Sequence, residues 1–155
     1  MTPRKELFIK VKQALMTIPE LELVDLERGQ MQDDSFPDLL VSAFIRINSI
    51  SYQSMTEQNQ EGDVSIDVTL YCRDGWLQQH NGTNDPDHGL NEIDLLDDIA
   101  DVLQSLYGDQ FKPLQQVEDA TEEQGIKGMF SYRQSFNTTI YRKLKPKYQP
   151  VKLTI

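Results

Sequence analysis

The feature that most constrains the fold is a strictly alternating stretch near the middle of the chain. Between positions 63 and 72 apolar and polar side chains take turns, and the apolar set is Val64, Ile66, Val68, Leu70 and Cys72. A period of two places every second side chain on the same face of a β-strand. One face of this strand is then expected to pack on a core while the other faces solvent, as in many antiparallel sheets.

The stretch before this strand is expected to complete a hairpin. Residues 39–55 are rich in β-branched and aromatic side chains, and the polar segment TEQNQEG follows them as a turn signal. The apolar parity changes between Ile47 and Ile50, which a β-bulge near Asn48–Ser49 or a break into two strands would explain. We expect residues 44–72 to form a long antiparallel hairpin that can project past its own sheet.

Two other segments have the apolar spacing of helices with one buried face. The first covers residues 3–18 and follows Thr2, a residue type that favours the N-cap position. The second is expected to be capped by Asn91 and to run through Tyr107, with Gly108 as the glycine that ends it.

The remaining elements complete the fold prediction. Shorter strands are expected at 21–28 and 111–118, a polar turn at 119–125, and a last strong strand at 129–143. This order predicts an α+β fold, a mostly antiparallel sheet with a long β-hairpin and two helices packed on one face. A length of 155 residues suits one domain. We expect a single α+β domain over residues 1–143 and a basic C-terminal extension over residues 144–155.

Charge is distributed unevenly along the chain. The net charge is −10, yet residues 1–12 sum to +3 and residues 126–155 to +7, so that residues 13–125 carry −20. Unlike segments attract one another within a chain or between copies, whereas an acidic face also serves simply to keep a protein soluble. We expect the basic tail to contact the acidic body of an adjacent copy. The acidic domain opposes tight binding of DNA.

Several classes of site are excluded or unsupported. The one cysteine, Cys72, rules out an internal disulfide framework and a Cys-based zinc site, and its position on the apolar face predicts burial. There is no apolar run of the ~20 residues that span a membrane and no P-loop motif for nucleotides. The first residues lead into an amphipathic segment. We therefore expect no signal peptide, no cofactor and a location inside a cell.

The long loop at 73–90 offers an alternative. His80, Asp85, Asp87 and His88 lie within nine residues, and imidazole and carboxylate groups are common metal ligands. Their spacing matches no standard zinc or calcium loop, and Asn, Asp, Gly and Pro are also the residues of ordinary loops. We expect no metal here. A metal-binding module or metal-dependent enzyme that uses these four residues is the alternative hypothesis.

Four segments together resemble a known family. They are a leading amphipathic helix (KELFIKVKQAL), an alternating second strand of a long hairpin (DVSIDVTLYCRD), a helix after a loop (NEIDLLDDIADVLQSL) and a terminal strand (FSYRQSFNTTIYRK). In element order and pattern, residues 1–143 resemble the tail-terminator and head–tail joining proteins of long-tailed bacteriophages. The extended loop at 73–90 and the tail at 144–155 depart from that pattern.

The resemblance implies a structural protein of a phage or prophage and no enzyme. Family members are small α+β subunits that close into rings, often hexamers, which cap the tail tube and contact the head connector. DNA would pass through such a ring without specific binding, and the protein would reside in the bacterial host cytoplasm during assembly and then in the virion. The residues expected to carry contacts between copies are Asp63, Asp67, Arg142, Lys143, Lys145 and Lys147. A generic acidic interaction domain is a further alternative.

Overall fold

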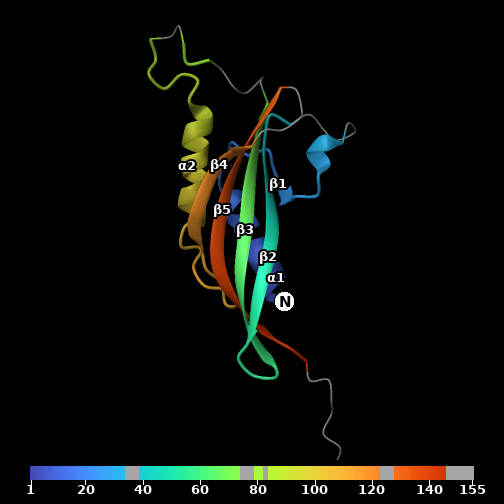
Figure 1. Ribbon diagram of the computed structural model, residues 1–155. Coiled ribbons are helices and arrows are strands. Elements are labelled where there is room, and N and C mark those ends of the chain that lie inside the picture. The colour runs from blue at the N-terminus through green and yellow to red at the C-terminus, as the bar shows by residue number, and fades with distance from the viewer. Residues whose placement is uncertain (34–38, 74–78, 82–83, 123–127, 146–155) are drawn as a thin grey trace, which may run out of the picture.

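Five strands form one sheet in the order β1-β2-β3-β5-β4, and two α-helices cover one of its faces (Figure 1). This computed structural model describes residues 1–33, 39–73, 79–81, 84–122 and 128–145. The elements are α1 Pro3–Leu15, β1 Leu23–Leu26, a short 3-10 helix at Gln30–Gln32, β2 Val41–Ser54, β3 Asn59–Arg73, α2 Asn91–Leu103, β4 Gln115–Glu122 and β5 Met129–Lys143. All strand pairs are antiparallel except β1 with β2. The predicted α+β class is confirmed.

The predicted hairpin is formed by β2 and β3. Its register shifts between Ile47 and Ser49, so the predicted bulge is confirmed and a single strand runs through it. β5 pairs with β3 along its whole length, from Asn59 opposite Lys143 to Arg73 opposite Met129. The hairpin is therefore part of a three-stranded arm that is longer than either outer strand, as Figure 1 shows.

The main core lies between the sheet and the two helices. The alternating side chains of β3 point into it, as the sequence predicts, and each is buried. Both helices contribute one stripe to this core, namely Leu7, Val11 and Leu15 from α1 and Leu95, Ile99 and Leu103 from α2. A smaller cluster of Met31, Phe44, Tyr71 and Met129 covers part of the opposite sheet face.

The first helix begins as predicted and ends earlier. The side-chain oxygen of Thr2 accepts a hydrogen bond from the Lys5 amide at 3.4 Å, which confirms the cap. The helix stops at Leu15, and the chain then turns, although Ile18 remains buried in the core. A residue can thus continue a buried stripe after the helix itself has ended.

The second helix is shorter than its apolar pattern indicates. It begins at Asn91 without a side-chain cap and ends at Leu103, so the predicted run through Tyr107 is wrong. The backbone leaves the helix because it pairs with the segment before β4: the Ser105 amide donates to the Leu114 carbonyl at 2.8 Å. Tyr107 is consequently 68% exposed, and Gly108 does not end the helix.

The fourth strand also differs from the expectation. The sequence predicts a strand at 111–118 followed by a turn at 119–125, whereas β4 covers Gln115–Glu122. Its second half is mostly polar, so it lacks the alternation of apolar and polar residues by which a strand is predicted. The polar residues are tolerated because β4 is an edge strand, and because Glu118 and Glu122 bind a cation on β5.

Candidate functional site

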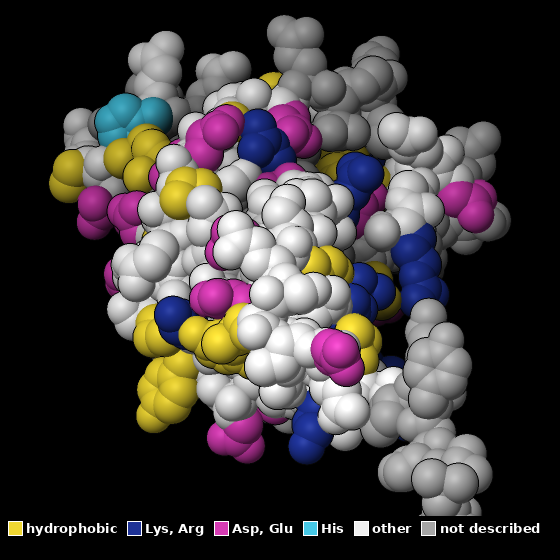
Figure 2. All heavy atoms as spheres, turned by 60° about the horizontal axis from the view of Figure 1, so that its bottom comes forward, with side chains coloured by type: hydrophobic (Ala, Val, Ile, Leu, Met, Phe, Trp, Pro, Cys, Tyr) yellow, Lys and Arg dark blue, Asp and Glu magenta, His cyan; other side chains and the backbone are white. Residues whose placement is uncertain are grey.

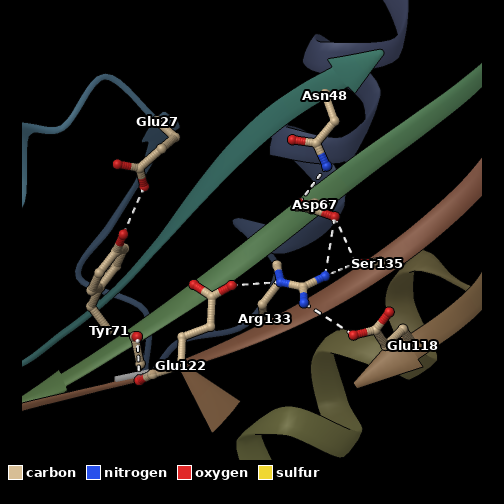
Figure 3. Close-up of polar contacts among 9 residues, drawn as sticks. Glu27, Asn48, Asp67, Tyr71, Glu118, Glu122, Arg133 and Ser135 are labelled. Carbon is tan, nitrogen blue, oxygen red and sulfur yellow. Dashed lines mark hydrogen bonds and ion pairs between the residues drawn. The ribbon is translucent and has the colours of Figure 1, made fainter. Parts of the chain in front are cut away.

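A polar network crosses the sheet face opposite the helices (Figure 3). Its centre is Arg133 on β5, whose Nε donates to Glu122 Oε1 at 2.6 Å and whose Nη2 donates to Glu118 Oε1 at 3.0 Å. The Nη1 atom lies 4.0 Å from Asp67 Oδ1 on β3. The hydrogen bond to Glu122 raises the pKa of the Arg133 guanidinium above its ordinary value. One cation thus joins carboxylates from both neighbouring strands.

The predicted interface residue Asp67 belongs to this network. Its carboxylate accepts hydrogen bonds from Ser135 Oγ at 2.6 Å and from the side-chain amide of Asn48. Asn48 is the bulge residue, and the bulge turns its amide toward β3. Asp67 is only 9% exposed. Its partners in the structure belong to its own chain, and a contact of Asp67 with a cation of a neighbouring copy stays a prediction.

The other predicted interface residues have different environments. Asp63 is exposed, and its Oδ1 accepts a hydrogen bond from Thr139 Oγ1 at 3.4 Å. Lys143 and Lys145 are exposed at the end of β5, whereas Lys147 lies outside the described residues. For these residues the contact with another copy stays a prediction.

Arg142 is held against its own sheet. Its guanidinium stacks over the ring of Tyr52, 4.0 Å from the centroid, and its Nε donates to Gln60 Oε1 at 3.2 Å. Gly62 lies opposite Tyr52 in the register, and a Cβ there would lie 3.1 Å from the tyrosine ring. Arg142 therefore helps to stiffen the arm, and only part of its side chain is available to a partner.

The residues of the alternative metal site do not converge. His80, Asp85 and Asp87 are exposed, and His80 Nδ1 lies 2.6 Å from the backbone oxygen of His88. Among the residues that the structure describes, no group of three or more His, Cys, Asp or Glu could hold a metal ion. The metal hypothesis therefore has no geometric support in this loop.

Cys72 is buried, as predicted. It is fully covered within the core, and burial raises the pKa of its thiol to about 12. A nucleophilic cysteine requires a thiolate near neutral pH and some exposure. Cys72 has neither property and acts as a small apolar side chain.

Sequence reasoning missed a basic groove beside α1. We use this name for a cavity of about 710 Å³ between α1, the end of β1 and the arm. Its apolar lining includes Phe8, Ile45, Ile47, Tyr52 and Ile140, and its charged lining comprises Arg4, Lys5, Arg46, Arg142 and one acid, Glu27. The available signals were the basic N-terminal segment and an arginine amid apolar residues in β2. These two signals do not predict that the N-terminal segment and β2 lie beside one another in the fold.

The opposite edge of the sheet is strongly acidic. We call α2 and β4 together the acidic edge. The stretch 84–122 that contains both elements holds eleven acidic residues and one basic residue, Lys112. Figure 2 keeps the left and right of Figure 1, and it shows Asp and Glu side chains among apolar ones toward the upper left, whereas most of the Lys and Arg side chains lie toward the right. The two edges of one sheet therefore differ in charge.

A scan against protein-family models found no matching family, and a search of curated proteins found no matching sequence. Within the described part of the chain, neither helix has the length and apolar character needed to cross a membrane.

Proposed function

We propose that this protein is a structural subunit that assembles with copies of itself, of the tail-terminator or head–tail joining type found in long-tailed bacteriophages. It acts without catalysis and without a cofactor. Its partners are further copies in a ring, the tail tube and the head connector. Its place is the bacterial host cytoplasm during assembly and then the virion.

The observation that carries this proposal is the unpaired outer edge of the arm. β1 pairs with β2 only as far as Ile45, and the last hydrogen bond joins the Glu27 amide to the Ile45 carbonyl at 2.9 Å. Within the described residues, the segment 46–54 of β2 has no strand on its outer side. Free backbone N–H and C=O groups along such an edge are a template for another chain.

The charge distribution supports assembly between copies over binding of a small molecule. Unlike surfaces at the two edges of one sheet favour a contact in which one patch meets a different patch on the next copy. Contacts of this head-to-tail kind generate rings when the rotation closes. A ring with an acidic surface toward its channel would let DNA pass without binding it.

The test is the mass of the purified chain measured by light scattering during size-exclusion chromatography, at low and high salt. We expect a discrete oligomer that weakens as salt screens the charges. Rings should be visible by negative-stain electron microscopy. A strict monomer at every concentration and salt would contradict the proposal and favour a generic acidic interaction domain.

A second test concerns the phage context. Added to purified tail-tube protein from the same genome, the oligomer is expected to stop tube elongation. Genes for portal, capsid and tube proteins are expected next to its own gene. An oligomer that leaves tube growth unchanged, encoded far from any such genes, would refute the phage role while leaving self-assembly intact.

A further inference from the structure

We propose that the basic groove receives the acidic edge of a second copy, so that α1 and β2 of one subunit contact α2 and β4 of the next. This inference rests on the proposed function, because it names the two surfaces through which copies meet. Apart from Arg142, it concerns residues outside the set that the sequence assigned to contacts between copies.

The basic groove combines an apolar floor with a net positive charge, as a binding surface for an acidic partner would. Its floor is apolar, with Phe8 and Ile47 among its lining residues. The rim residues Arg4 and Lys5 are exposed, and within the described residues neither has an ion-pair partner. Arg46 also lines the groove, from the edge strand β2, although it pairs in the register with Asp67 on the opposite sheet face. With Arg142 and the single acid Glu27, the lining carries a net charge of +3 in a chain of −10. The groove thus fits an acidic partner with an apolar centre.

The acidic edge offers such a surface. Asp94, Asp97 and Asp98 are exposed on α2, and the part of the chain that the structure describes provides no ion pair for them. Ile93 lies beside them on the helix and is 51% exposed, although it is a large apolar side chain. An apolar residue surrounded by carboxylates is complementary to an apolar floor rimmed by cations.

The fold prevents these surfaces from meeting within one chain. The groove lies beside β2 and the acidic edge includes β4, and β3 and β5 separate those two strands in the sheet. Contact between the surfaces consequently requires a second copy. Since each copy has one of each surface, the contact repeats head to tail, as a ring or a filament requires.

The experiment uses the full chain with single charge reversals on each surface. Arg4→Glu changes the groove, and Arg28→Glu makes the same change at an exposed arginine outside it. Asp97→Lys changes the acidic edge, and Glu20→Lys is its control at an exposed acid elsewhere. Sedimentation velocity gives the association constant, and circular dichroism with thermal melting verifies that each variant is folded.

We expect Arg4→Glu and Asp97→Lys each to weaken assembly by roughly tenfold or more, because an attraction becomes a like-charge contact. The two controls should assemble like the wild type. A mixture of the two weakened variants should assemble again, since each variant keeps one native surface and the altered surfaces are complementary. That recovery also shows that both variants fold.

Three results would overturn the inference. If the wild type assembles and the groove and edge variants behave like their controls, the copies meet elsewhere, and the proposed function stands. If the wild type is monomeric throughout, the proposed function fails and this inference fails with it. If assembly is unchanged but fluorescent polyglutamate binds the wild type and not Arg4→Glu, the groove belongs to a different acidic partner.

Discussion

Glu6 fastens the first helix to the segment that follows the second helix. Its two carboxylate oxygens accept hydrogen bonds from the side-chain amide and the backbone amide of Gln110, each at 3.0 Å. These bonds, the side-chain one foremost, lower the pKa of Glu6 below its ordinary value of 4.5. The contact joins residues more than a hundred positions apart, and no local pattern announces it.

The lowered pKa of Glu6 predicts a pH-dependent contribution to stability. A carboxylate with a depressed folded-state pKa stabilises the fold fully above its unfolded value, and this stabilisation is lost as the pH falls below 4.5. Glu6→Gln should therefore reduce the free energy of unfolding at neutral pH, and its deficit should shrink in acid. Urea denaturation at several pH values measures this. Glu20→Gln, at an exposed site, is the control, and a deficit independent of pH would contradict the prediction.

Gly108 lies where the neighbouring side chains leave no room for a Cβ atom. A Cβ at this position would lie 2.2 Å from Glu6 Oε1 and 2.5 Å from a ring carbon of Phe111. We expect Gly108→Ala to destabilise the fold by about 1–3 kcal/mol, the usual cost of overpacking. Chemical denaturation measures the loss. Asp109→Ala, at an exposed neighbour, should change stability by no more than about 0.5 kcal/mol. Equal stabilities for both variants would refute this account of the glycine.

At the scale of elements, the network around Arg133 links β5 to β3 and β4 through side chains, in addition to the backbone pairing of these strands. Arg133 is 25% exposed, whereas Glu118 is 54% exposed, so solvent screens part of the attraction. The lasting effect of the guanidinium is to keep three carboxylates on neighbouring strands from repelling one another. This explains why the acidic strand β4 remains attached to β5.

Replacement of Arg133 should therefore destabilise β4 and the fold. We expect Arg133→Met to cost about 1–2 kcal/mol, since it leaves partly exposed carboxylates without their cation. Added salt should reduce the deficit by screening the repulsion. Equilibrium unfolding at low and high salt measures both effects, with Arg28→Met as a matched control at an exposed arginine. A deficit that grows with salt would be inconsistent with this role.

At the scale of the whole molecule, the separation of charge decides which partners are attracted. The net charge is −10, and six of the cations lie at the groove or near the end of β5, namely Arg4, Lys5, Arg46, Arg142, Lys143 and Lys145. Such a surface repels a polyanion over most of its area and attracts one only locally.

We accordingly predict that the chain does not bind DNA firmly. A mobility-shift assay at low salt, where electrostatic binding is strongest, should show no stable complex. A polylysine peptide serves as the positive control for the assay. A stable, salt-sensitive complex with the protein would contradict this prediction and would also weaken the proposal that DNA passes through the assembly unbound.

The sequence by itself determined the elements whose signal is local. Alternation fixed the face of β3 and hence the core side of the hairpin, the parity change located the bulge at Asn48, and the helical stripes found α1 and α2. The end of α2 and the extent of β4 were missed, because pairing at Ser105 and binding of Arg133 override the local pattern there.

The surfaces depend on tertiary structure. Arg4, Arg46 and Arg142 line one groove although they are widely separated in the chain, and Asp67 is buried because Asn48, Arg133 and Ser135 converge on it. Periodicity reports which face a side chain takes on its own strand. It contains no information on which distant strand brings a partner, because that depends on strand order and register.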